Sequence, residues 1–554
     1  MSEKKIIDLL ANKNFKEAKD LIFKLLKVDS QNQKYNFYYG ILLAQEKKFN
    51  DAIKFFKIFL EKNSDDYDAN FNIANCYLVL LNFEKAIEHY KICTNLVIDR
   101  HEPFHQLGYC FKLIREYEKS ILSLIKAIKI KPNPNSYYIL AKVYRENGQF
   151  AESKKSLQLS ITQDCNFINS KLSLADLEND LGLHDKASEM ISEIIFLYKN
   201  DNHVLSKAYI IKGNILKSKG NYKSAIESNR KALEKDPRNI EAMYNLSLNY
   251  LFIKDYLNAW KFYESRYNLQ SFVLLKKIHN TFKKPRWDKN KPQKKILFYG
   301  EQGIGEQILY SQFISVIQDQ FENITLAVNQ KLVPFFKKIF NNIKVIDYRN
   351  IYQHDDYDFH FPMGSLGLFF QNEINNKILK KKIDYLVNND FIPKKIKKIR
   401  CGISWKSTNK IFGNKKSVEL GLFKELFLSN NIEFINLQYS NEDYDIEKLE
   451  KEINKKLFVD HNIDCFNDID GVASLIKSCD FIVTVSNSNA HISGKLGVKT
   501  FLLLTFNDGK LWYWGQNKDA DIIWYPSILP IRMNEENNWN SCILKLNKEL
   551  ENIL

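Results

Sequence analysis

An aromatic residue followed three positions later by a small one recurs along the first half of the chain, within stretches where apolar residues return every three or four positions. That spacing puts the apolar side chains on one face of a helix. The first four aromatics are spaced by 34 residues, and a few residues are inserted before Tyr222. We therefore predict eight helix pairs over residues 1–268. The pairs are Phe15/Ala18, Phe49/Ala52, Phe83/Ala86, Tyr117/Ser120, Phe150/Ser153, His184/Ala187, Tyr222/Ala225 and Tyr256/Ala259.

The period and the helix–turn–helix pattern resemble the tetratricopeptide repeat (TPR). In that repeat the small residue lets two helices cross closely while the aromatic fills the gap. The resemblance implies a curved solenoid with a concave inner face. Such a face holds a polypeptide or another protein partner, or the array serves as a spacer or dimerisation arm, and both interpretations stay open.

The second half alternates short apolar runs with helix-like segments, which is typical of parallel sheets joined by crossover helices. We expect a multidomain chain: an all-α solenoid, a linker at 269–294, and two Rossmann-like α/β domains at 295–390 and 396–554. A basic run with a proline at 388–398 separates the two groups of strands. The expected strands are 296–299, 324–328, 344–347, 358–361, 401–405, 433–438, 481–486 and 499–504.

Composition narrows the class of protein. The chain has 554 residues, 45% of them hydrophobic, and a net charge of +15 that comes from lysines mixed with acidic residues. Because no arginine-rich tract or regular basic helix stands out, we do not expect nucleic-acid binding. The eight cysteines form no close pair and no metal-ligand spacing, which favours a reducing compartment. No run approaches the roughly 18 apolar residues of a membrane span, so we expect a cytoplasmic protein.

Two strand-to-helix turns are the candidate sites. The first contains Gly300, Gly303 and Gly305, whose missing side chains let the backbone turn tightly and approach a ligand. The second runs from Ser486 to His491, where Ser and Asn are good N-caps. In each turn the free N–H groups of the following helix would face an anion.

Several motifs in order resemble the heptosyltransferase-like (family 9) glycosyltransferase domain that follows TPR repeats in bacterial proteins. The resemblance implies a two-Rossmann B-type fold, a nucleotide-sugar donor held mainly by the C-terminal domain, and hexosyl or heptosyl transfer that needs no metal or other cofactor. The motifs are Pro285-x-Trp287-Asp288, the Gly300–Glu306 turn, Ser404-Trp405, Asn436-Leu-Gln438, Asn489-Ala-His491-Ile-Ser-Gly494-x-Leu-Gly497, Trp512-Tyr-Trp514 and Ile523-Trp-Tyr-Pro526.

On the acceptor side, the resemblance makes Glu306 the base that deprotonates the acceptor hydroxyl, in a loop framed by Gly303 and Gly305. Family members usually have Asp there, and the extra methylene of Glu moves the carboxylate by roughly 1 Å. Alternatively, Glu306 only complements the helix dipole. Glu301 is the reserve candidate for the base, or it satisfies backbone donors in the loop.

On the donor side, we expect Ser486, Asn487, Ser488 and Asn489 to hold the diphosphate. The resemblance gives His491 a role in binding phosphate or stabilising the leaving nucleotide; alternatively, it bonds to neighbouring backbone. Relatives often have Asp-Thr where this chain has Ser486-Asn487, so one anionic contact is missing.

Four further residues are donor-site candidates. Lys406, Lys416 and Ser417 could neutralise or bond the donor phosphates, although lysine is abundant on solvated faces of this chain. Trp512 could stack on a base or sugar, or pack beneath the cleft. The Asp356-Tyr357-Asp358 segment has the spacing of a metal-binding Asp-x-Asp motif, but we expect no metal there.

The sequence therefore predicts a metal-independent glycosyltransferase whose repeats recruit a glycan or protein acceptor, or a protein partner. The alternative is a TPR scaffold with a degenerate, non-catalytic transferase domain.

Overall fold

The computed structural model describes the whole chain except residues 1, 13, 270–271, 273–277, 279–281, 291–293, 376–384, 386–397, 441, 507–508, 516–523, 536–537 and 552–554. The predicted basic segment at 388–398, which separates the two groups of strands, lies outside the described residues apart from Lys398. Ile523 of the last motif lies outside them as well. The chain divides into two compact units, Met1–Leu181 and Gly182–Leu554. None of the described helices is both long and apolar enough to cross a membrane.

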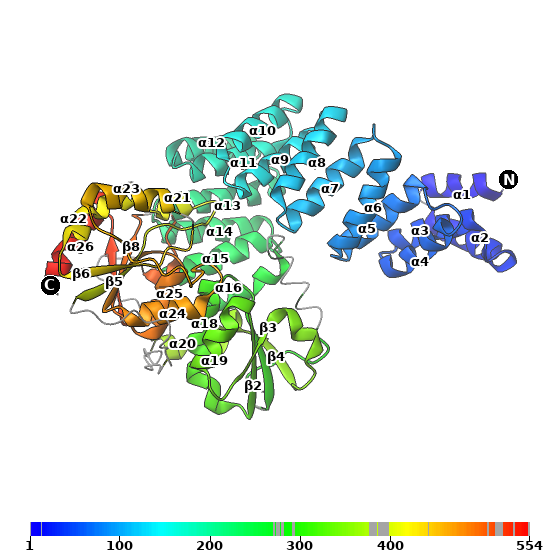
Figure 1. Cartoon of the computed structure of the whole chain (residues 1–554). Helices are drawn as coiled ribbons and strands as arrows, with labels where there is room; N and C mark the ends of the chain where they lie inside the picture. The colour runs from blue at the N-terminus through cyan, green and yellow to red at the C-terminus, as the bar shows by residue number, and fades with distance from the viewer. Residues whose placement is uncertain are drawn as a thin grey trace. The chain divides into compact units, whose positions relative to one another are not determined.

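The first unit is built from helices that pack in antiparallel pairs along the chain (Figure 1). Each aromatic of the repeating pattern is the first residue of the second helix in its pair, and each small residue one turn later is buried. The helices are α1 Ser2–Ala11, α2 Phe15–Val28, α3 Gln33–Gln45, α4 Phe49–Leu60, α5 Tyr67–Val79, α6 Phe83–Leu96, α7 His101–Leu113, α8 Tyr117–Ile130, α9 Pro134–Glu146, α10 Phe150–Gln163 and α11 Ile168–Asp180.

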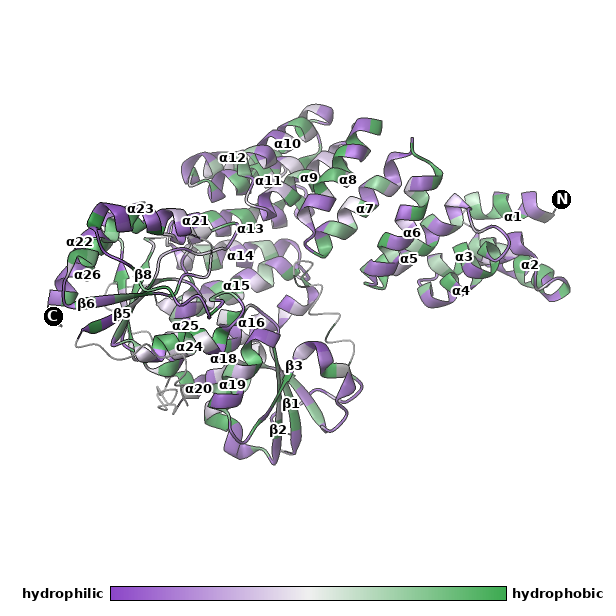
Figure 2. Cartoon of the chain, viewed as in Figure 1, coloured by the Kyte–Doolittle hydropathy of each residue, from purple (hydrophilic) through white to green (hydrophobic). Residues whose placement is uncertain are grey.

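Small residues are needed where the two helices of a pair cross. A Cβ atom on Gly108 of α7 would lie 2.6 Å from Cγ of Leu124 on α8. Where the repeat has Ser in place of Ala, the hydroxyl donates across the crossing, from Ser120 Oγ to the Gly108 carbonyl at 2.6 Å. Figure 2 shows hydrophobic and hydrophilic residues alternating along these helices. The predicted helical repeats are confirmed.

The second unit begins with five more repeat helices and a short 3-10 segment. The aromatic-plus-small pattern holds here too, because His184, Tyr222 and Tyr256 begin every second helix. These elements are α12 His184–Leu197, α13 Asn202–Ser218, α14 Tyr222–Lys235, α15 Ile240–Phe252, α16 Tyr256–Tyr263 and η1 Glu264–Asn268.

Two parallel sheets follow, as predicted. The first has four strands in the order β3-β2-β1-β4: β1 Lys295–Tyr299, β2 Asn323–Val328, β3 Lys344–Asp347 and β4 Phe359–Pro362. The second has five in the order β6-β5-β7-β8-β9: β5 Ile399–Ser404, β6 Ile432–Asn436, β7 Phe481–Val485, β8 Thr500–Leu504 and β9 Ile528–Arg532. The principal helices between and after the strands are α18 Ile304–Ile317, α19 Val333–Ile339, α20 Gly367–Asn375, α21 Gly413–Lys416, α22 Lys424–Leu428, α23 Asp443–Ile453, α24 Ile469–Ser478, α25 Ser488–Leu496 and α26 Trp539–Glu551.

Strand β9 was not predicted. Pro530 interrupts its short apolar run, and a proline is normally excluded from a sheet because it cannot donate to the ladder. It is tolerated here because β9 is the edge strand.

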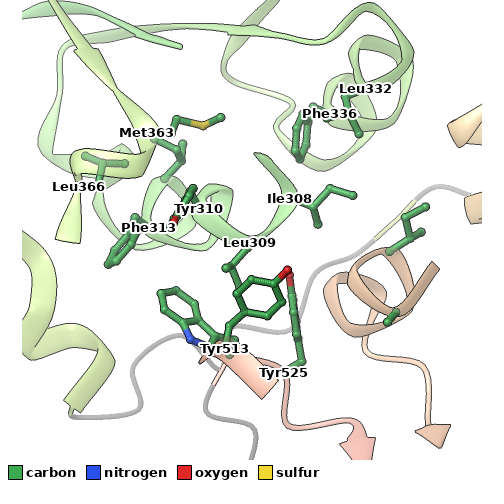
Figure 3. Close-up of a cluster of buried hydrophobic side chains, with 14 of the residues drawn as sticks. Ile308, Leu309, Tyr310, Phe313, Leu332, Phe336, Met363, Leu366, Tyr513 and Tyr525 are labelled. Atoms are coloured by element: carbon green, nitrogen blue, oxygen red, sulfur yellow. The ribbon is translucent and has the colours of Figure 1, made fainter. Parts of the chain in front are cut away.

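Helix α18 lies in a core cluster to which both sheet regions contribute. Its Leu309 and Phe313 are completely buried. Figure 3 shows side chains of α18 between Met363 and Leu366, which follow β4, and Tyr513 and Tyr525 of the C-terminal region. The resulting core cluster extends from Tyr222 in the repeats to Ile528 at the start of β9.

A buried lysine lies in the same contact. Lys495 on α25 donates to Gln312 Oε1 at 2.8 Å and to Ser315 Oγ at 3.0 Å, both on α18. Burial lowers the pKa of Lys495 to about 7. The α18–α25 contact is thus held by hydrogen bonds as well as by apolar packing.

The last repeat packs directly against the first sheet region. Trp260 of α16 is almost fully buried, and its indole N–H donates to the Gly364 carbonyl at 2.9 Å. Gly367 at the start of α20 lies against the Trp260 ring so closely that a Cβ atom there would be 1.9 Å from Cε2. The contact therefore requires glycine at position 367.

We predict that Gly367→Ala destabilises the second unit by about 2 kcal/mol or more, since overpacking a core typically costs 1–3 kcal/mol. Gly421→Ala is the matched control, because a Cβ atom at Gly421 would have no neighbour within 4 Å. Chemical denaturation of the two variants gives the comparison. Equal stability of the Gly367 and Gly421 variants would contradict the packing described for Trp260.

Candidate functional site

The turns after β1 and β7 open onto one cavity of about 620 Å³. The carboxyl ends of parallel strands are where α/β proteins bind ligands, and here α18 and α25 both begin at the cavity. A third wall comes from the repeats. It consists of Lys217, Ser218, Tyr222, Leu248 and Phe252.

Glu306 lies in the first turn of α18 and lines the cavity. Burial raises the pKa of its carboxyl group, against the opposing effects of its own backbone N–H and of the positive charge of Lys416. The carboxylate folds back over Gly303, where a Cβ atom would lie 2.9 Å from Oε2. Glu306 therefore faces the cavity and complements its own helix at the same time.

The glycines of the first turn matter because they permit close approach. None of the three is in the left-handed backbone region. A Cβ atom on Gly305 would lie 2.7 Å from Cδ2 of His491, and one on Gly300 would lie 2.5 Å from Cδ of Gln307. The first turn thus contacts the second at Gly305.

His491 is a buried, neutral imidazole. Burial, together with the positive charge of Lys416, lowers its pKa to about 3. Its Nδ1 lies 3.1 Å from the Tyr525 hydroxyl, and its ring packs against Trp514 at a centroid distance of 4.7 Å. Burial raises the Tyr525 pKa well above its usual value, so this hydroxyl keeps its proton. If Tyr525 donates to Nδ1, Nε2 carries the proton and can donate toward the Gly305 side of the cavity.

The cavity is rich in cations. Lys217, Lys331, Lys416 and Lys510 line it, with Glu306 as the lining carboxylate. Burial lowers the pKa of Lys416, with Glu306 opposing the shift, and burial together with nearby Arg532 lowers that of Lys510 to about 8. This charge balance, with the N-terminus of α25, suits an anionic ligand such as a diphosphate.

The four polar residues of the second turn have different environments. Ser486, Asn487 and Ser488 line the cavity, whereas Asn489 donates to the Leu437 carbonyl at 2.7 Å. Ser486 Oγ accepts the Trp514 indole N–H at 3.0 Å. Asn487 caps α25 and donates to Ser404 Oγ at 3.1 Å. Much of their hydrogen-bonding capacity therefore holds the turn itself.

Two further predicted donor residues, Lys406 and Ser417, also do not line this cavity. The Lys406 ammonium pairs with Glu442 and with Asp445, the latter at 2.8 Å. Ser417 Oγ donates to the Gly413 carbonyl at 2.7 Å and accepts the Ser407 backbone N–H at 3.0 Å. Trp512 does line the cavity, and its ring also packs edge-on against Trp260.

Glu301 is engaged by the repeats. Its side chain is almost fully buried, and it forms an ion pair with Arg266 of η1. It also accepts the Tyr267 hydroxyl at 2.7 Å. The sequence patterns that identified the turns gave no indication of Arg266, because it lies outside both turn motifs, just after the last repeat helix.

The described residues contain no cluster of three or more His, Cys, Asp or Glu side chains arranged to hold a metal ion. In the Asp-x-Asp segment, Asp356 pairs with Lys295 Nζ at 2.7 Å. Asp358 Oδ2 accepts the Lys295 backbone N–H at 3.3 Å.

Sequence models of the tetratricopeptide repeat match residues 101–134, 134–164 and 206–239, and a second model of that repeat matches residues 42–92. The chain therefore contains tetratricopeptide repeats. Protein FlbA of Caulobacter vibrioides is 21% identical over 294 residues, which cover 49% of this chain and 48% of FlbA. The chain thus spans about half the length of this curated relative.

Two solved repeat proteins are similar to part of this chain at low identity and low TM-score. A tetratricopeptide repeat protein from Parabacteroides merdae is 16% identical with a TM-score of 0.38, covering 45% of this chain and 98% of its own. YrrB, described as a TPR protein with an unusual peptide-binding site, is 20% identical with a TM-score of 0.27, covering 34% of this chain and 95% of its own.

The raised pKa of Glu306 gives a prediction about stability. The folded state binds the Glu306 proton more tightly than the unfolded state, so the wild type loses stability as pH rises from the ordinary glutamate pKa through the raised one. Glu306→Gln removes that loss. We expect the variant to be as stable as the wild type or more stable at pH 7, with an advantage that shrinks as pH falls toward 4. Thermal unfolding across this pH range measures the difference in stability. A variant that is less stable than the wild type at pH 7 would contradict the conclusion that the ionised Glu306 side chain destabilises the folded protein.

Proposed function

We propose that the second unit is a glycosyltransferase of the two-Rossmann B type that moves a sugar from a nucleotide-sugar donor to an acceptor hydroxyl. One observation carries the proposal. The carboxylate of Glu306, at the start of the helix after β1, lines the same cavity as Lys416 and the N-terminus of α25 from the second sheet region, and the charges of Glu306 and Lys416 influence each other. A base and an anion site that line one cavity match the needs of glycosyl transfer.

In the proposed reaction, the acceptor oxygen attacks the anomeric carbon of the donor sugar. The bond from that carbon to the diphosphate oxygen breaks, and the acceptor proton passes to Glu306. Burial keeps the Glu306 carboxylate more basic than an ordinary glutamate. The diphosphate leaves with its charge balanced by Lys416, Lys510 and the N–H groups that begin α25.

In this scheme His491 is uncharged and donates a hydrogen bond. With a pKa of about 3 it carries no charge near neutrality, so it is suited to a hydrogen bond and not to proton delivery. Its contact with Gly305 places it where the donor and acceptor sides meet.

In this proposal the repeats help to bind the acceptor. Tyr222 and Phe252 stack at a centroid distance of 4.5 Å and form part of the third wall. A glycan or protein acceptor that reaches Glu306 would pass this wall. We propose that the remaining repeats recruit the acceptor or a protein partner.

A scaffold is the second candidate function. The matched tetratricopeptide repeats support it. So does the engagement of Ser486, Asn487, Lys406 and Ser417 in contacts within the protein. In that case the repeats would bind a protein partner and the sheet regions would have only a structural role.

Donor binding is the first test. We expect calorimetry with UDP-, GDP-, ADP- and CMP-sugars to identify one that binds, and Lys416→Ala to weaken it at least tenfold, or about 1.4 kcal/mol. Lys406→Ala is the matched control, because Lys406 is paired with Glu442 and Asp445. Failure of the wild type to bind any of these donors would favour the scaffold.

Glu306→Gln tests the chemistry separately from binding. The amide is nearly isosteric but cannot accept the proton, so we expect transfer to fall about 100-fold or more with donor affinity preserved, in line with typical general-base contributions. A radiolabelled-donor assay on matched protein concentrations measures this. Unchanged transfer would remove Glu306 from the mechanism.

A further inference from the structure

The end of the repeat array holds the loop that presents Glu306. Arg266 is completely buried in η1. Its Nε donates to Glu301 Oε1 at 3.1 Å, and its Nη2 donates to Glu301, to the Tyr267 hydroxyl at 2.6 Å and to Ser365 Oγ at 2.7 Å. The guanidinium thus joins the end of the last repeat, the glycine loop and the turn that follows β4.

This network is strongly charged, and its Arg266 and Glu301 side chains are buried. Burial by itself would lower the pKa of Arg266, but the charge of Glu301 and the other acceptors around it raise that pKa well above its usual value. Glu264 is a second carboxylate of the network, and its pKa is lowered by Arg266 and Arg286 in spite of its burial. An arginine so committed cannot change its geometry without leaving charges unpaired.

A second contact holds the next residue of the loop. Gln302 Nε2 donates to the Tyr263 hydroxyl of α16 at 2.6 Å, and that hydroxyl lies 3.0 Å from the Tyr310 hydroxyl of α18. From the other side, Gln307 Nε2 donates to the Gln302 carbonyl at 2.7 Å, while Gln307 Oε1 accepts the Asn329 backbone N–H at 2.9 Å.

We propose that Tyr263 and Arg266, both supplied by the end of the repeat array, are positioning residues that fix the loop at 300–303 and so set where α18 begins and where Glu306 points. The inference rests on the proposed function for its kinetic consequence. Neither residue lines the cavity, so both act through the loop and not on the substrate. The last repeat therefore contributes to the geometry of the site although it supplies neither of these side chains to the cavity.

Tyr263→Phe is the decisive variant, because it removes only a hydroxyl. A misplacement of about 1 Å can cost about 100-fold in rate, and we expect kcat to fall at least tenfold while the donor KM and Kd change less than about twofold. Hydrogen–deuterium exchange should become faster in residues 300–307 and stay unchanged in residues 481–496. Tyr250→Phe is the matched control, since the Tyr250 hydroxyl accepts from Arg230 at 2.7 Å within the repeats.

Arg266→Lys and Arg266→Gln extend the test. Lysine keeps the positive charge but lacks the planar, multiply donating guanidinium group. The lysine variant should therefore have a kcat between those of the wild type and the glutamine variant. Arg400→Gln is the control for loss of a buried arginine, because Arg400 Nε pairs with Glu433 at 2.7 Å away from the loop. It should lower stability without a selective change in kcat or in exchange at 300–307.

An unchanged kcat in Tyr263→Phe, or a loss of activity matched by Arg400→Gln at equal stability, would overturn the inference. If the wild type neither binds a nucleotide sugar nor transfers its sugar, the proposed function is wrong. Hydrogen–deuterium exchange in residues 300–307 then tests the positioning role separately, and an unchanged exchange rate in Tyr263→Phe would refute that role.

Discussion

The fold of the second unit depends on helix α18 being buried along nearly its whole length. A helix that is apolar on one stripe can lie on the surface of a sheet, but α18 buries ten of its fourteen residues and so must be covered on every side. The first sheet region, α25, the C-terminal aromatics and the repeats share that task. Because all of them pack on one helix, the position of its N-terminus relative to the second sheet is fixed by the core, and the site lies at that N-terminus.

This arrangement explains why the two turns contact each other although they are far apart in sequence. Gly305 and His491 approach to a distance that excludes a side chain at position 305. The Lys495 bridge to Gln312 and Ser315 holds the same two helices further along. Glu306 and Lys416, which line the cavity from the two sheet regions, influence each other's pKa, and no ion pair between them is among the contacts of the described residues.

Local patterns predicted the repeats and most strands well because those elements are defined by short-range periodicity. The aromatic at the start of each second helix and the small residue one turn later are visible in the sequence and have the same role in the structure. The two turns were found for the same reason.

What the sequence could not show was the partner of each side chain. Glu301 and Lys406 are carboxylate and ammonium groups in the expected loops, yet Arg266 and the pair Glu442 and Asp445 engage them. Those partners are from 35 to 39 residues away along the chain, and no periodicity links them.

The division of the chain between Leu181 and Gly182 falls inside the repeat array, well before the first strand. The second unit therefore contains the last repeats together with both sheets, and it includes the Trp260 contact and the third wall of the cavity. No described residue before this division lines the cavity, whereas a chain that began at β1 would lack Tyr263 and Arg266, which contact the loop at 300–303. The surroundings of the cavity are therefore incomplete without the final repeats, and a fragment meant to contain the whole cavity has to begin well before the first strand.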